Sequence, residues 1–206
     1  MMTTGLTTES LRNGLRRISV KLQASADELN TLDGKLGDGD IGVTMSNGMK
    51  LVSASLDDLP DDVGMALLKC AQAFSSVSGS SFSTLMATGL MSAAKECKGR
   101  TEVPWGETAD LLGGAIEKMA SRGKSELGEK TVLDALEAVR QGAVDKEGPA
   151  EILAAADAAV AQTLETFLQK PNKQGRARMF GEKSIGQHDP GMVVIKRILD
   201  GLQADS

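Results

Sequence analysis

The sequence predicts an all-α fold, and three observations lead to it. Apolar residues recur at spacings of three and four along most of the chain, which is the period of an amphipathic helix. Aromatic residues make up only 2% of the chain and tyrosine is absent, whereas sheets favour aromatic and β-branched residues. No segment alternates convincingly between apolar and polar residues, as a half-buried strand would. The 206 residues suffice for one domain, over residues 1–206, with a substantial aliphatic core.

Four helices are expected in the first half of the chain, over about residues 8–29, 45–56, 60–77 and 85–96. Thr7 or Thr8 can cap the first helix, whose leucine, isoleucine and alanine side chains follow on one face. A glycine-rich acidic loop separates it from the second helix. Pro60 opens the third, with Asp61 and Asp62 in its first turn, where carboxylates interact favourably with the helix dipole. The segment "SGSS" separates the third helix from the fourth.

Four more helices are expected over about residues 104–119, 132–139, 149–170 and 190–202. Pro104 and Pro149 open the fifth and the seventh, because proline suits the first helical position. A polar loop, "SRGKSELGEK", separates the fifth helix from the sixth. The seventh is rich in alanine and ends before Pro171, where the long loop "NKQGRARMFGEKSIGQHDPG" begins. Asp189 caps the eighth helix and Pro190 opens it, so the expected fold is a bundle of eight helices.

The charge and the apolar runs exclude several classes of function. The net charge of −5 and the isoelectric point near 5.0 argue against general binding to nucleic acid or to an anionic membrane. The first ten residues, "MMTTGLTTES", lack the apolar region of a signal peptide, and no apolar run approaches the ~18 residues of a membrane span. We therefore expect a cytoplasmic protein in which Cys70 and Cys97 are reduced thiols.

Three carboxylates, those of Asp33, Asp38 and Asp40, lie among four glycines in the segment "LDGKLGDGDIGVT". Three of these glycines spell G-x-G-x-x-G, but the preceding segment is expected to be helical and carboxylates inside the turn would repel a pyrophosphate. A calcium loop starting at Asp38 would need glutamate at its twelfth position, which is Met49. Clustered carboxylates suit Mg²⁺, which prefers oxygen ligands and often shares them with substrate phosphates. The alternative is a solvated turn whose aspartates cap helices.

Two other loops have residues suited to phosphate. Gly79, Ser80 and Ser81 precede the fourth helix, where free N–H groups and hydroxyls can hold an anion, although serine can equally serve as an N-cap. A serine nucleophile is disfavoured, since "GSSFS" does not fit G-x-S-x-G and His188 is the only histidine. The last long loop offers three cations that form either a phosphate clamp or a solvated surface: Arg176, Arg178 and Lys183.

Taken together, these loops resemble one family. The segments "LDGKLGDGDIG", "SVSGSS", "RGKSELGEKTVLDAL" and "GRARMFGEKSIGQHDPG" occur in the order seen in the ADP-binding (DhaL-type) domain of dihydroxyacetone kinases, and the resemblance spans about residues 6–202. It implies a closed antiparallel barrel of eight helices. It also implies that ADP or ATP and two Mg²⁺ ions bind at one mouth of that barrel.

The resemblance also implies roles for single residues. The metal-binding carboxylates would be Asp33, Asp38 and Asp40. The nucleotide-binding residues would be Gly42, Val43, Thr44, Gly79, Ser80, Ser81, Gly123, Val132, Arg176, Asp189, Pro190 and Gly191. The chain departs from the family pattern at Ile41, Phe82 and Gln187, which leaves the phosphoryl donor and the ketose open.

In this family, a histidine on another domain or subunit holds the ketose covalently, and the chain is expected to act with such a substrate-binding kinase subunit. Two donors are open: exchanging ATP, or bound ADP that a phosphocarrier protein of the phosphotransferase system rephosphorylates. Two alternatives also stay open. One is an ATP-using subunit that acts on another ketose, such as a tetrulose, and the other is a nucleotide-sensing module without catalysis.

Overall fold

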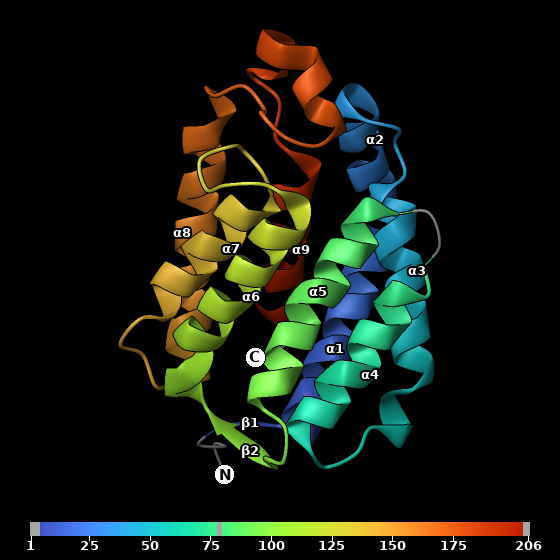
Figure 1. The fold of residues 1–206 in the computed structure, drawn as a ribbon, viewed down its shortest axis with the longest axis vertical. Helices are drawn as coiled ribbons and strands as arrows, with labels where there is room; N and C mark the ends of the chain where they lie inside the picture. The colour runs from blue at the N-terminus through green and yellow to red at the C-terminus, as the bar shows by residue number, and fades with distance from the viewer. Residues whose placement is uncertain (1–4, 78–79, 204–206) are drawn as a thin grey trace.

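The computed structural model describes residues 5–77 and 80–203, and most of them are helical (Figure 1). The α-helices are α1 (Thr8–Ala24), α2 (Ala26–Leu36), α3 (Ile41–Ala54), α4 (Val63–Ser75), α5 (Ser81–Glu96), α6 (Thr108–Gly123), α7 (Val132–Ala143), α8 (Pro149–Leu168) and α9 (Pro190–Gln203). The short 3₁₀ helices are η1 (Leu56–Asp58), η2 (Trp105–Glu107) and η3 (Arg176–Ser184). The predicted all-α fold class is confirmed.

The long helices pack on one another in sequence. Each of α3, α4, α5, α6, α7, α8 and α9 contacts the next in that order, and α1 contacts both α3 and α9. The enclosed core is aliphatic, as the composition predicts: the side chains of Leu22, Leu29, Met45, Val52 and Val194 are almost completely buried. Among the described residues, no helix combines the length and the apolar character that crossing a membrane requires.

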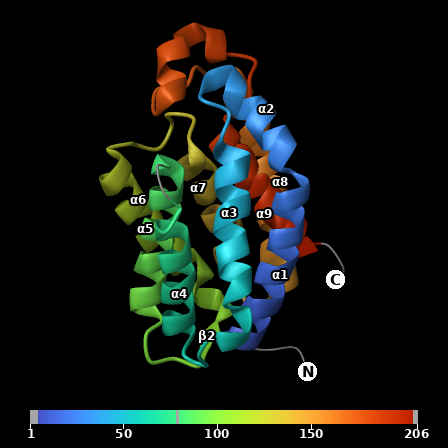
Figure 2. The ribbon, with the colours of Figure 1, turned by 90° about the vertical axis from the view of Figure 1, so that its right-hand side faces the viewer.

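The first predicted helix is two helices. It breaks at Ser25, and α2 then extends beyond α1 along the same side of the molecule (Figure 2). The apolar spacing continues across the break, which is why the pattern predicts one helix. The consequence matters for the site, because Asp33 lies in the last turn of α2 rather than in a loop.

The sequence-based prediction of no strands is wrong for two short segments. Strands β1 (Gly5–Thr7) and β2 (Glu102–Pro104) pair in antiparallel register, with Leu6 opposite Val103. They are too short to show an alternating pattern. They also shift a helix start: because Pro104 ends β2, the fifth predicted helix begins at Thr108 instead.

The third predicted helix likewise begins later than Pro60. Asp62 is its N-cap and accepts a hydrogen bond from the Met65 N–H at 2.9 Å, so α4 begins at Val63. The capping carboxylate, rather than the proline, determines this boundary. The start of α9 is as predicted, with Asp189 accepting from the Met192 N–H at 3.0 Å and Pro190 at the first helical position.

The small sheet and η3 lie at opposite ends of the molecule (Figure 1). At the upper end in that view, η3 packs on α2. We call this end the mouth of the bundle; it comprises the last turn of α2, residues 37–40, the loop 124–131 and η3. All the candidate site residues that the structure brings together lie near it.

Candidate functional site

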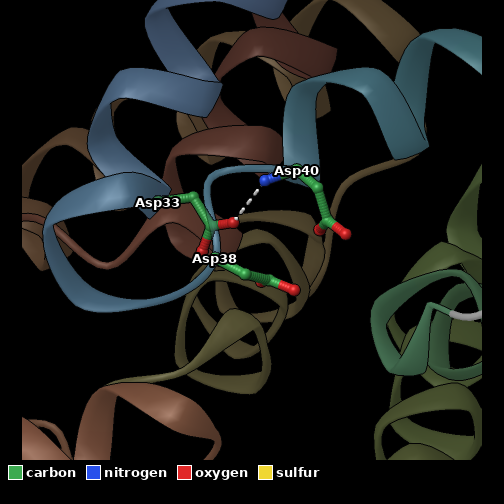
Figure 3. Close-up of side chains that lie close together, drawn as sticks. All are labelled: Asp33, Asp38 and Asp40. Atoms are coloured by element: carbon green, nitrogen blue, oxygen red, sulfur yellow. Dashed lines mark hydrogen bonds between the residues drawn. The ribbon is translucent and has the colours of Figure 1, made fainter.

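The three aspartates converge at the mouth. One carboxylate oxygen from each of Asp33, Asp38 and Asp40 lies within 4.8 Å of the others (Figure 3). Asp33 comes from α2, Asp38 from the connecting turn, and Asp40 immediately precedes α3. The turn is fixed by Asp33, whose Oδ2 accepts hydrogen bonds from the Asp40 N–H at 2.9 Å and the Ile41 N–H at 3.3 Å. The side chain of Asp40 makes no capping bond to the first turn of α3.

The glycines around the aspartates have local structural roles. Gly39 has a φ of +77°, a region that side chains disfavour. A Cβ on Gly42 would lie 2.0 Å from the Ala26 carbonyl oxygen, because the first turn of α3 passes directly over the start of α2. These requirements account for the glycine spacing without a dinucleotide. They support the rejection of the G-x-G-x-x-G reading.

Asn30 is a contributor that the sequence reasoning missed. Its Oδ1 accepts from the N–H groups of Gly42, at 2.8 Å, and Val43, at 3.2 Å. An asparagine within a helical stretch gives no sequence signal of this role, because its partners are twelve and thirteen residues away. It anchors the first turn of α3 to α2 and so fixes the acidic turn between them.

The acidic cluster is electrostatically unfavourable in the absence of a cation. The pKa of Asp40 is raised, first by the partial loss of hydration of its carboxylate and then by repulsion from Asp38 and Asp33. Arg176 of η3 forms an ion pair with Asp38 and partly offsets this repulsion. Three converging hard oxygen donors with residual repulsion fit a divalent cation such as Mg²⁺.

A cavity of about 630 Å³ opens beside the cluster. Its lining combines the aspartates with Ser80, Ser81, Arg176 and several apolar residues. The predicted site residues that line it are Asp33, Asp38, Asp40, Ser80, Ser81, Gly123, Val132, Arg176, Asp189, Pro190 and Gly191. Thus segments separated by more than 150 residues supply one pocket, which is large enough for a small-molecule ligand.

Three predicted residues that the structure describes, Gly42, Val43 and Thr44, do not line this pocket. Gly42, Val43 and Thr44 form the first turn of α3, and the Gly42 and Val43 N–H groups already donate to Asn30. Thr44 is buried, and its N–H donates to the Asp40 carbonyl at 2.9 Å. The prediction for Gly79 lies outside the described residues. These four nucleotide contacts stay predictions.

The structure bears on the alternatives for the two other loops that have residues suited to phosphate. Ser80 caps α5, accepting from the Ser83 N–H at 3.2 Å, and it also lines the pocket. Of the three cations in the last loop, only Arg176 lines the pocket, while Arg178 and Lys183 are exposed.

Asp189 and Gly191 form one corner of the pocket. A Cβ on Gly191 would lie 3.1 Å from Asp189 Oδ1 and 3.1 Å from the ring of Phe82, so glycine keeps this corner open. Desolvation raises the pKa of Asp189 to about 7, although the Met192 N–H and the nearby Lys130 oppose the shift. Phe82, at which the chain departs from the family pattern, lies in the pocket wall.

The fold and the site define an all-helical domain with a candidate divalent-metal pocket at one end. Comparison with known families gives a match to the DAK2 domain over residues 35–204. The chain belongs to this family, and the sequence-based assignment to the DhaL type is confirmed by its relatives.

Three relatives illustrate the similarity. The ADP-binding subunit DhaL of the PEP-dependent dihydroxyacetone kinase 2 of Listeria innocua is 30% identical, over 86% of this chain and 85% of its own. The corresponding DhaL subunit of the PEP-dependent kinase of Escherichia coli is 28% identical, over 87% and 88%. A third, the L-erythrulose 1-kinase of Mycolicibacterium smegmatis, is 28% identical over 94% of this chain, which spans only 35% of that relative.

Solved structures share the fold. The dihydroxyacetone kinase from C. freundii in complex with AMP-PNP and Mg²⁺ superposes with a TM-score of 0.76 and 20% identity. All of this chain is covered, but only 35% of that one. At this identity the likeness establishes the fold alone.

Proposed function

We propose that this chain, over residues 1–206, is the nucleotide- and Mg²⁺-binding subunit of a two-component kinase that phosphorylates dihydroxyacetone or a related ketose held on a partner subunit. The observation that carries the proposal is the convergence of Asp33, Asp38 and Asp40 on a pocket that also contains Arg176 and Ser80. Carboxylates, a guanidinium and hydroxyls at one cavity are the groups that a metal-bound phosphate chain requires. The DhaL relatives, which are named as ADP-binding subunits, support the same reading.

The residues present fit the metal. Mg²⁺ takes oxygen ligands and retains water molecules, so three carboxylates on a partly exposed turn leave room for water and for phosphate oxygens. We propose that Asp33, Asp38 and Asp40 together hold two ions. When bound, these ions would supply charge neutralisation to the phosphate chain. The raised pKa of Asp40 supports this assignment, since a cation would relieve the repulsion that raises it.

The pocket suggests how the nucleotide lies. Ser80, Ser81 and Arg176 offer hydrogen-bond donors to phosphate oxygens, and Arg176 is already directed at the acidic cluster through Asp38. The apolar lining near Gly123 and Val132 would receive the base. The chain's own residues therefore position and neutralise the donor phosphate, and these two effects supply most of the catalysis in phosphoryl transfer.

The acceptor is the part of the reaction that this pocket does not provide. Within residues 5–77 and 80–203, the one cluster of carboxylates close enough together to hold a metal ion lines this pocket, and we assign the pocket's polar groups to the nucleotide. A small ketose has few atoms with which to gain affinity from surface contacts. We therefore propose that a substrate-binding subunit presents it at the mouth. Bound ADP would be recharged by a phosphocarrier, as the PEP- and PTS-dependent relatives suggest.

A second candidate is an ATP-using subunit of a kinase for another ketose, such as a tetrulose. The match to the L-erythrulose 1-kinase favours it. A nucleotide-sensing module without catalysis is less well supported, because it would not need three converging carboxylates.

One reconstitution separates these possibilities. Ketose phosphorylation is measured for the chain alone and with a substrate-binding kinase subunit, using ATP in one series and a phosphoenolpyruvate-driven phosphocarrier system in the other. We expect negligible activity from the chain alone and turnover with both the partner and the phosphocarrier. Turnover with partner and ATP alone would favour the second candidate. Robust phosphorylation by the isolated chain would overturn the two-component proposal.

A further inference from the structure

Lys130 is a buried lysine that the proposed chemistry does not use. Its side chain is among the largest that are almost completely enclosed, with 1% of its surface exposed. The ammonium donates to two main-chain carbonyls, that of Lys170 at 2.8 Å and that of Ser184 at 3.0 Å. Lysine is rarely buried because its charge must leave water, so a buried lysine with defined partners calls for an explanation.

Two more buried polar residues complete the network. The side-chain amide of Asn172 donates to the Lys130 carbonyl at 2.9 Å and to Asp189 Oδ2 at 2.9 Å. The Asn172 N–H donates to Ser184 Oγ at 2.8 Å, and that hydroxyl donates to the Gly181 carbonyl at 2.6 Å. Asn172 is 3% exposed and Ser184 is fully buried. We call Lys130, Asn172 and Ser184 the buried network.

The buried network joins segments that are far apart in the sequence. Lys130 lies at the end of the loop that precedes α7, and its two carbonyl partners lie 40 and 54 residues away. Those partners flank residues 171–183, the segment that contains Arg176. The same segment is tied to the loop by surface contacts, for example from Gln174 Nε2 to the Lys124 carbonyl at 2.6 Å. Through its two hydrogen bonds, Lys130 links both ends of residues 171–183 to the protein interior.

We propose that Lys130 is a positioning residue for the pocket: by fastening the Lys170 and Ser184 carbonyls, it holds residues 171–183 so that Arg176 faces Asp38 at the mouth. This inference rests on the proposed function, because it assigns Arg176 a role toward nucleotide phosphate. A lysine suits the task, since one ammonium can donate to two carbonyls in different directions. A methionine of similar length would fill the space but leave both carbonyls without their donor.

The test compares Lys130→Met in two backgrounds. Calorimetry measures Mg²⁺–ADP affinity for the wild type, Lys130→Met, Arg176→Ala and the double variant. We expect Lys130→Met to weaken binding about tenfold or more in the wild-type background and less than about threefold when Arg176 is already alanine, because residues that act through each other are not additive. Equal losses in both backgrounds, or no loss in the first, would overturn the inference.

Two further variants test whether a loss of affinity in Lys130→Met comes only from global destabilisation. Val103→Ala opens a cavity in β2, at the opposite end of the molecule, and should lower the melting temperature without changing ADP affinity. Ser184→Ala removes only the hydroxyl of the network and should show a smaller loss of affinity that again depends on Arg176. An affinity loss for Val103→Ala matching that of Lys130→Met would mean that global destabilisation explains both.

Hydrogen exchange separates this inference from the proposed function. If Lys130 positions the segment, amides of residues 172–186 should exchange faster in Lys130→Met than in the wild type, while those of α4 and α5 stay unchanged. This readout needs no nucleotide. Failure of the wild type to bind Mg²⁺–ADP would refute the proposed function, whereas unchanged exchange in this segment would refute the role of Lys130.

Discussion

Arg176 and Asp38 form an ion pair across the mouth of the pocket, joining η3 to the turn between α2 and α3. Both side chains are substantially exposed, 61% for the arginine and 40% for the aspartate. Ion pairs this exposed contribute little to stability. The importance of the pair is that it places a guanidinium next to the acidic cluster, where a phosphate would lie between the arginine and a metal ion.

Replacing Arg176 with lysine tests whether the planar guanidinium is required. Lysine keeps the charge but cannot make paired hydrogen bonds to phosphate. We expect Mg²⁺–ADP affinity to fall on the order of tenfold, which corresponds to about 1.4 kcal/mol and to the usual worth of one hydrogen bond to a charged group. Arg178→Lys, an exposed position on the same segment, is the matched control and should bind normally. Near-normal binding by Arg176→Lys would mean that Arg176 is a solvated surface charge with no specific role in binding phosphate.

Gly42→Ala tests the packing that supports the acidic turn. The added Cβ would lie 2.0 Å from the Ala26 carbonyl oxygen. The position of a Cβ is fixed by its own backbone and the carbonyl belongs to a helix, so neither atom can rotate away. We expect a loss of about 1–3 kcal/mol in the free energy of unfolding, measured by urea denaturation, together with weaker Mg²⁺ binding. Gly34→Ala in α2 is the control. Its Cβ would meet only an ordinary contact at 3.8 Å, and alanine favours helix, so stability should hold or rise. A stable Gly42→Ala would show that α2 and α3 are not packed as described.

The raised pKa of Asp189 predicts a pH dependence of stability. Because the folded pKa is about 7 and the unfolded pKa is about 4, the folded state keeps a proton between these values that the unfolded state has lost. The contribution of Asp189 is therefore fully present below about pH 4 and is lost as the pH rises to about 7. The Asp189→Asn variant, which can still cap α9, should lack this dependence. The free energy of unfolding of both proteins is measured by urea denaturation at pH 5 and pH 8. The wild type should be less stable relative to Asp189→Asn at pH 8 than at pH 5. A stability difference between the two proteins that is the same at both pH values would contradict the assignment.

His188→Asn tests whether the chain's single histidine takes part in proton transfer. His188 precedes Asp189 but does not line the pocket, and its Nδ1 is buried without a hydrogen-bond partner among the described residues. We expect the reconstituted activity to be largely retained. A general base typically contributes a hundredfold or more, so a loss of that size in a folded variant would reveal a catalytic role.

The fold class and the presence of the long helices could be predicted from the sequence because helical apolar spacing is a local signal. Proline gave the correct start for α8 and α9, at Pro149 and Pro190. Boundaries set by distant or competing contacts could not be predicted. Asp62 caps α4 and also accepts from the Gly99 N–H at 2.8 Å, and Gly5 pairs with Pro104 across most of the first half of the chain. Neither partner can be read from residues nearby in sequence.

In the candidate site, too, features with a local sequence signal could be predicted and features that depend on distant contacts could not. The acidic cluster was predictable because three carboxylates in one short segment are a local signal. The family resemblance added further residues, of which Ser80, Ser81 and Arg176 line the same pocket and Gly42, Val43 and Thr44 do not. Asn30 and Lys130 were missed because each acts through partners twelve or more residues away. In the sequence, Asn30 is an ordinary amide in a helix and Lys130 is an ordinary lysine in a loop. Only the folded structure shows that both make hydrogen bonds next to the pocket.

The central claim is that Asp33, Asp38 and Asp40 bind the metal through which a nucleotide is held. The most direct test is calorimetry of ADP binding to the wild type and to Asp38→Asn, each with Mg²⁺ and with a chelator, and with Asp27→Asn, an exposed position on α2, as the control. Asparagine keeps the size of aspartate but removes a charge that the metal requires. The account predicts ADP binding by the wild type and Asp27→Asn only when Mg²⁺ is present, and a loss of that binding in Asp38→Asn. Equal ADP affinity of Asp38→Asn and the wild type in Mg²⁺ would contradict it.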